Sequence, residues 1–193
     1  MKKRYEVRLS GSGGQGMILA GVILAEAAAI YDNKQAIQSQ SYGPEARGGA
    51  SKSEVIISDE AIDFPKAIEI DTLVALTQEA CDKYHGDLKQ NGNLIIDNDR
   101  VWELPKGDYK LYKIPFVRLA KENLGKEIVA NIIMLGSVAE ITGIVSETAI
   151  RKAVLARVPK GSEELNRKAL EFGIELAKNY KGDEKDGKNI RNN

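Results

Sequence analysis

The glycine-rich run Gly11-Ser12-Gly13-Gly14-Gln15-Gly16 is the first segment whose residue types could do chemistry. It has the spacing G-x-G-x-x-G and lies between a predicted strand, residues 5–10, and a predicted helix, residues 15–31. Glycines let the backbone approach phosphate oxygens, and the unpaired N–H groups at the helix start then receive the anion. Gln15 adds a side-chain amide. The run indicates a phosphate site, against the alternative of a tightly packed turn without a ligand.

A dinucleotide is disfavoured as the ligand of this turn. The dinucleotide-binding fingerprint requires an acidic residue at the end of the second strand, where it holds the ribose hydroxyls. The second predicted strand, residues 36–40, ends in Gln38-Ser39-Gln40 and has no carboxylate. Asp32 falls in the turn before that strand. A free-standing NAD- or flavin-binding protein nevertheless stays open as an alternative.

A second segment, residues 41–49, combines an aromatic residue, a proline, two opposite charges and three glycines. Proline restricts one backbone angle while glycines allow unusual ones, so such a loop can be both shaped and ordered. The planar guanidinium of Arg47 suits a carboxylate or a phosphate. We expect the loop to face a ligand or a partner, rather than to be a solvated loop with a weak surface ion pair. Its candidate residues are Tyr42, Gly43, Pro44, Glu45, Arg47, Gly48 and Gly49.

Composition excludes several classes of protein. Lys and Arg number 28 and Asp and Glu number 28, so no net charge draws the chain to nucleic acid or to an anionic membrane. The single cysteine, Cys81, cannot form an intramolecular disulfide or hold an iron–sulfur cluster, and we expect it to be buried and unreactive. The longest apolar stretch, residues 17–30, is too short to span a bilayer, and two charges within residues 5–9 interrupt the apolar core that a signal peptide needs. We therefore expect a cytoplasmic protein.

The remaining chemistry-bearing residues are assigned structural roles. We expect His85 to lie at a helix end, where its ring interacts with the terminal carbonyls, and Asp97-Asn98-Asp99 to form a turn rather than a calcium loop. We expect Trp102 to anchor the loop that follows it. The sequence therefore offers no catalytic residue that this chain could use alone, and no metal site.

Strand-like and helix-like patterns alternate along the chain and must position the two glycine-rich segments. Between the second and third predicted strands lies a loop and no crossover helix, so these two strands are antiparallel or are not neighbours. The sheet is therefore predicted to be mixed. The predicted strands cover residues 5–10, 36–40, 53–58, 72–76, 93–97 and 109–114, and the predicted helices cover residues 15–31, 78–84, 116–124, 127–142, 146–156 and 162–180.

Interleaved strands and helices predict an α/β fold, a three-layer αβα Rossmann-like domain with a mixed sheet and a helical C-terminal third. Residues 1–180 are expected to form this single domain. Residues 181–193 contain seven charged residues and only one aliphatic side chain, Ile190. Such a segment cannot offset the entropy of ordering, so we expect a disordered tail.

The order of these motifs resembles the gamma subunit of 2-oxoacid:ferredoxin oxidoreductases. The similarity covers roughly residues 4–180, and Ser12 at the second position of the glycine run is more similar to the 2-oxoglutarate branch than to the pyruvate branch. The two glycine-rich segments are its most specific part. Further matching segments are Ser53-Glu54-Val55-Ile56-Ile57-Ser58-Asp59, Ile62-Asp63-Phe64-Pro65, residues 71–80 and Asn131-Ile132-Ile133-Met134-Leu135-Gly136.

The resemblance implies an enzyme complex that oxidatively decarboxylates a 2-oxoacid on thiamine diphosphate, reduces ferredoxin through iron–sulfur clusters and releases an acyl-CoA. This chain has one cysteine and no Gly-Asp-Gly followed by an Asn-Asn pair, the pattern that binds magnesium and the thiamine pyrophosphate. Thiamine diphosphate, magnesium and the clusters are therefore expected on partner subunits. The resemblance implies an alpha and a beta chain, with a ferredoxin-like delta chain in some members.

What remains for this chain is binding and architecture. Both glycine-rich segments are expected at the carboxyl ends of early strands, where α/β sheets present ligands. We hypothesise that they face the active site formed by partner chains and help to receive coenzyme A or to close the site. Gly13, Gly14 and Gln15 would donate hydrogen bonds to phosphate, and Arg47 would supply charge. The alternative is an assembly subunit whose motifs contact only the alpha chain and touch no ligand.

Replacing the guanidinium in the second segment tests this hypothesis. In the reconstituted complex, Arg47→Ala should raise the concentration of coenzyme A needed for half-maximal turnover, because a charge that faces phosphate is lost. The measurement is steady-state turnover against coenzyme A concentration. An unchanged affinity and turnover in a fully assembled complex would rule out the coenzyme A role of Arg47.

Overall fold

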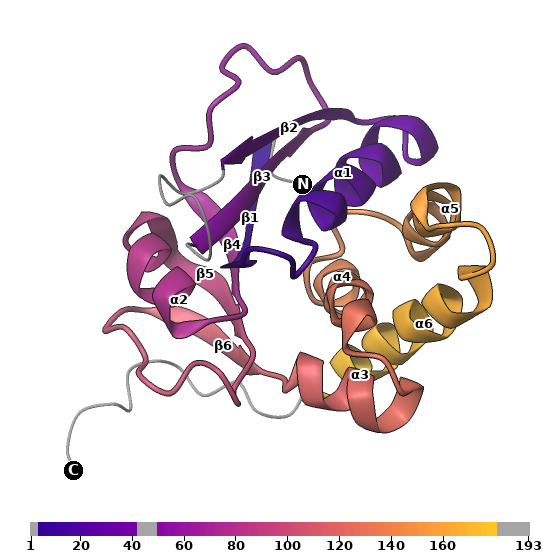
Figure 1. Cartoon of the computed structure of the whole chain (residues 1–193). Helices are drawn as coiled ribbons and strands as arrows, with labels where there is room; N and C mark the ends of the chain where they lie inside the picture. The colour runs from indigo at the N-terminus through magenta and orange to yellow at the C-terminus, as the bar shows by residue number, and fades with distance from the viewer. Residues whose placement is uncertain (1–3, 42–49, 181–193) are drawn as a thin grey trace.

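A computed structural model of the chain describes residues 4–41 and 50–180, and it contains one six-stranded mixed sheet (Figure 1). The strand order is β2-β3-β1-β4-β5-β6. The strands are β1 (Arg4–Ser12), β2 (Gln35–Ser41), β3 (Ala50–Ser58), β4 (Ile70–Ala75), β5 (Leu88–Ile96) and β6 (Tyr109–Lys113). The predicted tail, residues 181–193, lies outside the described residues.

The helices occupy the positions that the periodicity predicts. They are α1 (Met17–Glu26) with a π-helical turn (Ala27–Tyr31), α2 (Gln78–Tyr84), α3 (Phe116–Leu124), α4 (Ala130–Thr142), α5 (Glu147–Arg157) and α6 (Glu163–Asn179). Short 3-10 turns, His85–Asp87 and Glu127–Val129, adjoin α2 and α4. Four consecutive helices after β6 confirm the predicted helical C-terminal third. Within residues 4–41 and 50–180, no helix has the length and apolar character needed to cross a bilayer.

The direction of the strands places two connections at one edge of the sheet. β1 pairs antiparallel with β3, and β3 pairs antiparallel with β2, which confirms the predicted mixed sheet. Because the direction reverses twice, β2 runs the same way as β1, and their carboxyl ends lie at the same edge. β4, β5 and β6 continue in parallel from β1. We call the edge where β1, β2, β4 and β5 end the carboxyl edge.

The three layers are present but unequal. α2 lies on one face of the sheet, while α1 and α4 cover the other face, with α5 and α6 beyond them (Figure 1). α1 contacts β3 on one side and α4 and α5 on the others, so it is buried nearly all round, as its uniformly apolar sequence predicts. The larger core therefore lies on the α1–α4 side of the sheet.

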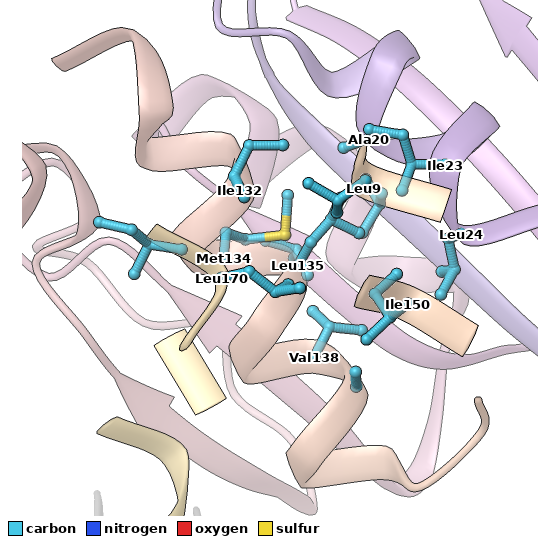
Figure 2. Packing of buried hydrophobic residues seen from close by; sticks show 14 of the residues in the cluster. Leu9, Ala20, Ile23, Leu24, Ile132, Met134, Leu135, Val138, Ile150 and Leu170 are labelled. Atoms are coloured by element: carbon cyan, nitrogen blue, oxygen red, sulfur yellow. The ribbon is translucent and has the colours of Figure 1, made fainter. Parts of the chain in front are cut away.

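Alternating side chains of the strands divide the core into two clusters. Leu9 of β1 points into the larger cluster, where it meets Ile23 of α1 and Leu135 of α4 (Figure 2). Leu73 of β4 points to the opposite face and joins the smaller cluster under α2 with Cys81. Alternate residues of the same strands thus enter the two clusters, one on each face of the sheet.

α4 and α6 pack so closely that only glycine fits at their crossing. A Cβ atom on Gly173 would overlap the carbonyl oxygen of Ile133 and come within 2.8 Å of its carbonyl carbon. Ser137 of α4 donates a hydrogen bond to the Gly173 carbonyl at 2.9 Å. The close approach brings the backbone of α6 within hydrogen-bonding distance of α4 and fixes the position of the C-terminal helices.

Gly173→Ala should destabilise the protein by roughly 1–3 kcal/mol, because a methyl group at this crossing must push the two helices apart. The matched control is Gly86→Ala, since a Cβ at Gly86 meets nothing within 4 Å. Denaturant unfolding of both variants measures the difference. Equal stability of Gly173→Ala and the wild type would show that the helix crossing relaxes without cost.

Candidate functional site

The glycine-rich run begins within the sheet. β1 extends to Ser12, so Gly11 lies in the strand, the turn itself covers residues 13–16, and α1 begins at Met17, two residues later than predicted. Gly14 and Gly16 have φ angles of 87° and 76°, a left-handed conformation that glycine adopts at little cost. Gly16 is the N-cap of α1, and Asn131 of α4 stands where its side chain would be. The turn therefore needs glycine at both positions.

Gln15 folds back onto the turn that it belongs to. Its Oε1 accepts a hydrogen bond from the Ser12 N–H at 2.7 Å, and it occupies the space that a Cβ on Gly11 would need. Because a backbone N–H can face only the amide oxygen, the Nε2 group points away from Ser12. The oxygen of Gln15 is thus committed to shaping the turn, and only its NH₂ group remains to donate to a ligand.

The start of α1 has the features of an anion site. In the described part of the chain, no side chain caps this helix end, and its first turn contains no acidic residue. The first N–H groups of a helix lack intrahelical partners, and the helix dipole favours negative charge there. Gly13 and Gly14 are exposed, and a Cβ at either would meet nothing within 4 Å. An anion therefore has both hydrogen-bond donors and room.

Two pockets flank this turn. One of about 230 Å³ is lined by Gly14, Gln15 and Arg100, and one of about 280 Å³ is lined by Gly16, Leu19 and Lys126. Ile128 lies between them and lines both. The larger pocket is mainly apolar, with Ile132 and Leu165 on its wall. The site thus joins a polar turn to an apolar groove.

Arg100 and Lys126 are functional candidates that the sequence analysis missed. Both side chains are exposed, and neither forms an ion pair with another described residue. Arg100 follows β5 at the carboxyl edge, and its position after a buried parallel strand is a signal that could have found it. Lys126 precedes α4, and nothing in its local sequence marks it. The fold places one cation on each side of the turn.

Asp97 holds the segment that carries Arg100. Its carboxylate is buried and accepts hydrogen bonds from the Asp99 N–H at 3.1 Å and the Val117 N–H at 3.0 Å. Burial raises the pKa of Asp97, and the two backbone hydrogen bonds oppose that rise. Asp97 thus shapes the turn after β5 and fixes the start of α3, in agreement with the interpretation of this triplet as a turn.

The anchors of the second glycine-rich segment lie beside the first. Ser12, at the end of β1, is paired with Ala50, at the start of β3, and Ser51 donates a hydrogen bond to the Gly11 carbonyl at 3.3 Å. Ser41, the last residue of β2, also lies at this edge. The loop residues themselves, Tyr42, Gly43, Pro44, Glu45, Arg47, Gly48 and Gly49, lie outside the described residues. That they face a ligand stays a prediction.

Three other residues test the structural roles expected of them. Cys81 is fully buried, and the ring of His85 contacts the Cys81 carbonyl at 3.0 Å, as expected at the end of α2. The prediction for Trp102 is wrong, because its side chain is 72% exposed and anchors nothing in the described structure. No group of three or more His, Cys, Asp or Glu among the described residues is arranged to hold a metal ion.

The fold and the site at the carboxyl edge together define a class of protein, and comparison with known proteins identifies that class. Residues 6–176 match the family Pyruvate ferredoxin/flavodoxin oxidoreductase, and the chain belongs to this family. It is 58% identical over 180 residues to 2-oxoglutarate synthase subunit KorC of Methanocaldococcus jannaschii, covering 92% of this chain and 96% of that protein.

Solved structures agree with this family. The gamma subunit of a keto/oxoacid ferredoxin oxidoreductase from Geobacter sulfurreducens superposes with a TM-score of 0.86 at 58% identity, covering 92% of this chain and 98% of that chain. A 2-oxoglutarate:ferredoxin oxidoreductase from Magnetococcus marinus, solved with 2-oxoglutarate, coenzyme A and succinyl-CoA bound, has a TM-score of 0.81 at 24% identity. This similarity shows a shared fold. The superposition covers 93% of this chain and 32% of the longer chain from Magnetococcus marinus.

The buried thiol gives a test of the structure close to this edge. Burial and the neighbouring Asp82 raise the pKa of Cys81 to about 11, so about one thiol in a thousand is ionised at pH 8. The folded protein should react very slowly with a thiol reagent at pH 8 and rapidly in denaturant, because only the thiolate is the nucleophile. Rapid labelling of the folded chain would contradict the burial of α2 against the sheet.

Proposed function

We propose that this chain is the gamma subunit of a 2-oxoglutarate:ferredoxin oxidoreductase, also called 2-oxoglutarate synthase, and that residues 1–180 act as one domain of it. The complex oxidatively decarboxylates 2-oxoglutarate, transfers the acyl group to coenzyme A and reduces ferredoxin. The observation that carries the proposal is the 58% identity, over nearly the whole length of both chains, to a protein of that name. Ser12 in the glycine-rich run supports the same branch.

The chemistry is divided between subunits. The described residues of this chain include no group of ligands that fits a metal ion, and the single cysteine does not fit an iron–sulfur cluster. Thiamine diphosphate, magnesium and the clusters therefore belong to the alpha and beta subunits, with a delta subunit in some complexes. Electrons reach ferredoxin through those chains. This subunit contributes binding surface at the shared active site.

Coenzyme A is the ligand that best fits the carboxyl edge. Its phosphate groups match the N–H donors at Gly13 and Gly14, where a Cβ would meet nothing within 4 Å, and at the start of α1, which no described side chain caps. Arg100 and Lys126 add one positive charge on each side of the turn. Arg47 of the second segment supplies a third. The mainly apolar pocket of about 280 Å³ suits the less polar arm of the same molecule.

An assembly role without ligand contact is the second candidate. Ile128, between the two pockets, is 73% exposed, and an apolar side chain in that position suits contact with another protein. A free-standing NAD or flavin enzyme has less support, because β2 ends in Ser39-Gln40-Ser41 without the carboxylate that holds ribose.

Gly13→Ala and Arg100→Ala test the coenzyme A site in the reconstituted complex. A Cβ at Gly13 meets nothing within 4 Å, so the variant should fold normally while its methyl group keeps a phosphate away from the backbone. Each variant should raise the apparent KM for coenzyme A by roughly tenfold or more, the value of one charge-assisted hydrogen bond. The KM for 2-oxoglutarate should stay unchanged. Steady-state turnover against each substrate measures both.

Arg118→Ala is the matched control for Arg100→Ala. Arg118 is also an exposed arginine near the carboxyl edge, but it is paired with Asp99 at 2.7 Å and lines neither pocket. Its removal should leave the KM for coenzyme A within about twofold of wild type, since its charge is already paired with Asp99 and is screened at the surface. Equal effects of Arg100→Ala and Arg118→Ala would point to general electrostatics. No effect of Gly13→Ala or Arg100→Ala would favour the assembly role.

A further inference from the structure

Trp102 is held in a fixed position on the surface. It is the only tryptophan of the chain, and its side chain is 72% exposed. The backbone N–H of Trp102 donates a hydrogen bond to Oε1 of Gln78 at 2.9 Å, and the backbone N–H of Glu103 donates to the same oxygen at 3.0 Å. Nε2 of Gln78 donates to the Glu103 carbonyl at 2.9 Å. The backbone that carries the indole is thus clamped by one glutamine side chain.

The indole is not needed to attach this segment to the fold. Val101 is buried in the cluster under α2, and Leu104 packs against that cluster. These two neighbours, together with the Gln78 clamp, already fix the backbone on both sides of Trp102. Exposing so large an apolar side chain to water forgoes the free energy that its burial would contribute. In the described structure the indole is thus exposed to solvent and is not needed for the packing of this segment.

Trp102 lies on a surface that is continuous with the candidate site. Gln78, which clamps it, is the first residue of α2, and the next residue, Glu79, accepts a hydrogen bond from the Ala50 N–H at 3.1 Å. Ala50 in turn is paired with Ser12 at the start of the glycine turn. A chain of direct contacts therefore runs along the carboxyl edge from that turn to Trp102.

We propose that Trp102 is an anchor residue that inserts into an apolar pocket of the partner subunit completing the active site. This inference rests on the proposed function, which makes the carboxyl edge the face turned toward that subunit. Tryptophan, tyrosine and arginine are enriched among the few residues that carry most of the binding energy at protein interfaces. In the Magnetococcus marinus enzyme this fold covers 32% of a longer chain, so the same fold there is attached to a larger body of protein.

Two other exposed apolar residues lie away from this edge. Phe64 and Ile68 belong to the connection between the end of β3 and the start of β4, and both of those strand ends lie at the opposite edge of the sheet. The Phe64 carbonyl accepts a hydrogen bond from Arg4, at the start of β1. Phe64 is therefore a matched control, an exposed aromatic residue on the far side of the molecule.

Because the chain has one tryptophan, 5-fluorotryptophan labelling gives a single ¹⁹F resonance that reports on Trp102 alone. The labelled full chain is mixed with its unlabelled alpha and beta subunits. On assembly the resonance should shift, and its sensitivity to exchange of H₂O for D₂O should fall to a small fraction of the value in the free chain. An assembled complex whose resonance keeps the position and solvent sensitivity of the free chain would overturn the anchor role and leave the proposed function intact.

Affinity measurements with two variants separate the remaining outcomes. Trp102→Ala should weaken assembly at least tenfold while the unfolding midpoint stays at the wild-type value, and Phe64→Ala should leave assembly within about twofold. Equal weakening by both variants, or none by Trp102→Ala, overturns the proposal. A resonance that shifts with concentration of the labelled chain alone identifies a second copy as the occupant and also overturns it. Failure of the wild-type chain to assemble removes both the proposed function and this inference.

Discussion

The antiparallel ladder between β1 and β3 is the constraint on which the rest of the structure depends. It ends with Ser12 opposite Ala50, so the glycine turn and the start of β3 are neighbours because two strands share a register. A shift of one residue would turn every side chain of β1 to the other face. The ladder also carries the opposed pair Arg8 and Glu54, whose charged groups lie 2.6 Å apart. Register, core and site are thus set by one set of hydrogen bonds.

The buried charge in this ladder strengthens that constraint. Arg8 is 2% exposed, and its guanidinium also pairs with Asp87 at 2.6 Å and lies over the ring of Tyr84. A buried arginine without these partners would be strongly unfavourable, so alternative registers that separate them are penalised. Tyr84 also donates a hydrogen bond to the Ala50 carbonyl at 3.2 Å. α2 is thereby tied to the ladder, and its first turn holds the surface around the site.

Much of the architecture was predictable because local patterns report local burial. The bounds of α2 and α3 agree with the prediction residue for residue, and the missing crossover helix correctly indicated that β2 and β3 are antiparallel. The family resemblance was likewise carried by contiguous motifs. The candidate site was less predictable. The amide oxygen of Gln15 turns back onto the Ser12 N–H, and Arg100 comes from the turn after β5, more than eighty residues away in sequence. Trp102 was expected to anchor the loop that follows it, but Val101 and Leu104 pack against the core while the indole stays exposed.

The sequence by itself determined the element types, the mixed sheet and a composition whose single cysteine does not fit an iron–sulfur cluster. Those properties follow from periodicity, turn residues and the single cysteine, which are all readable along the chain. Only the tertiary structure decided that Arg100 and Lys126 flank the glycine turn, and that α2 presents Trp102 on the same edge. The physical reason is that such contacts depend on strand order and direction, which bring distant segments together and leave no periodic trace in the sequence.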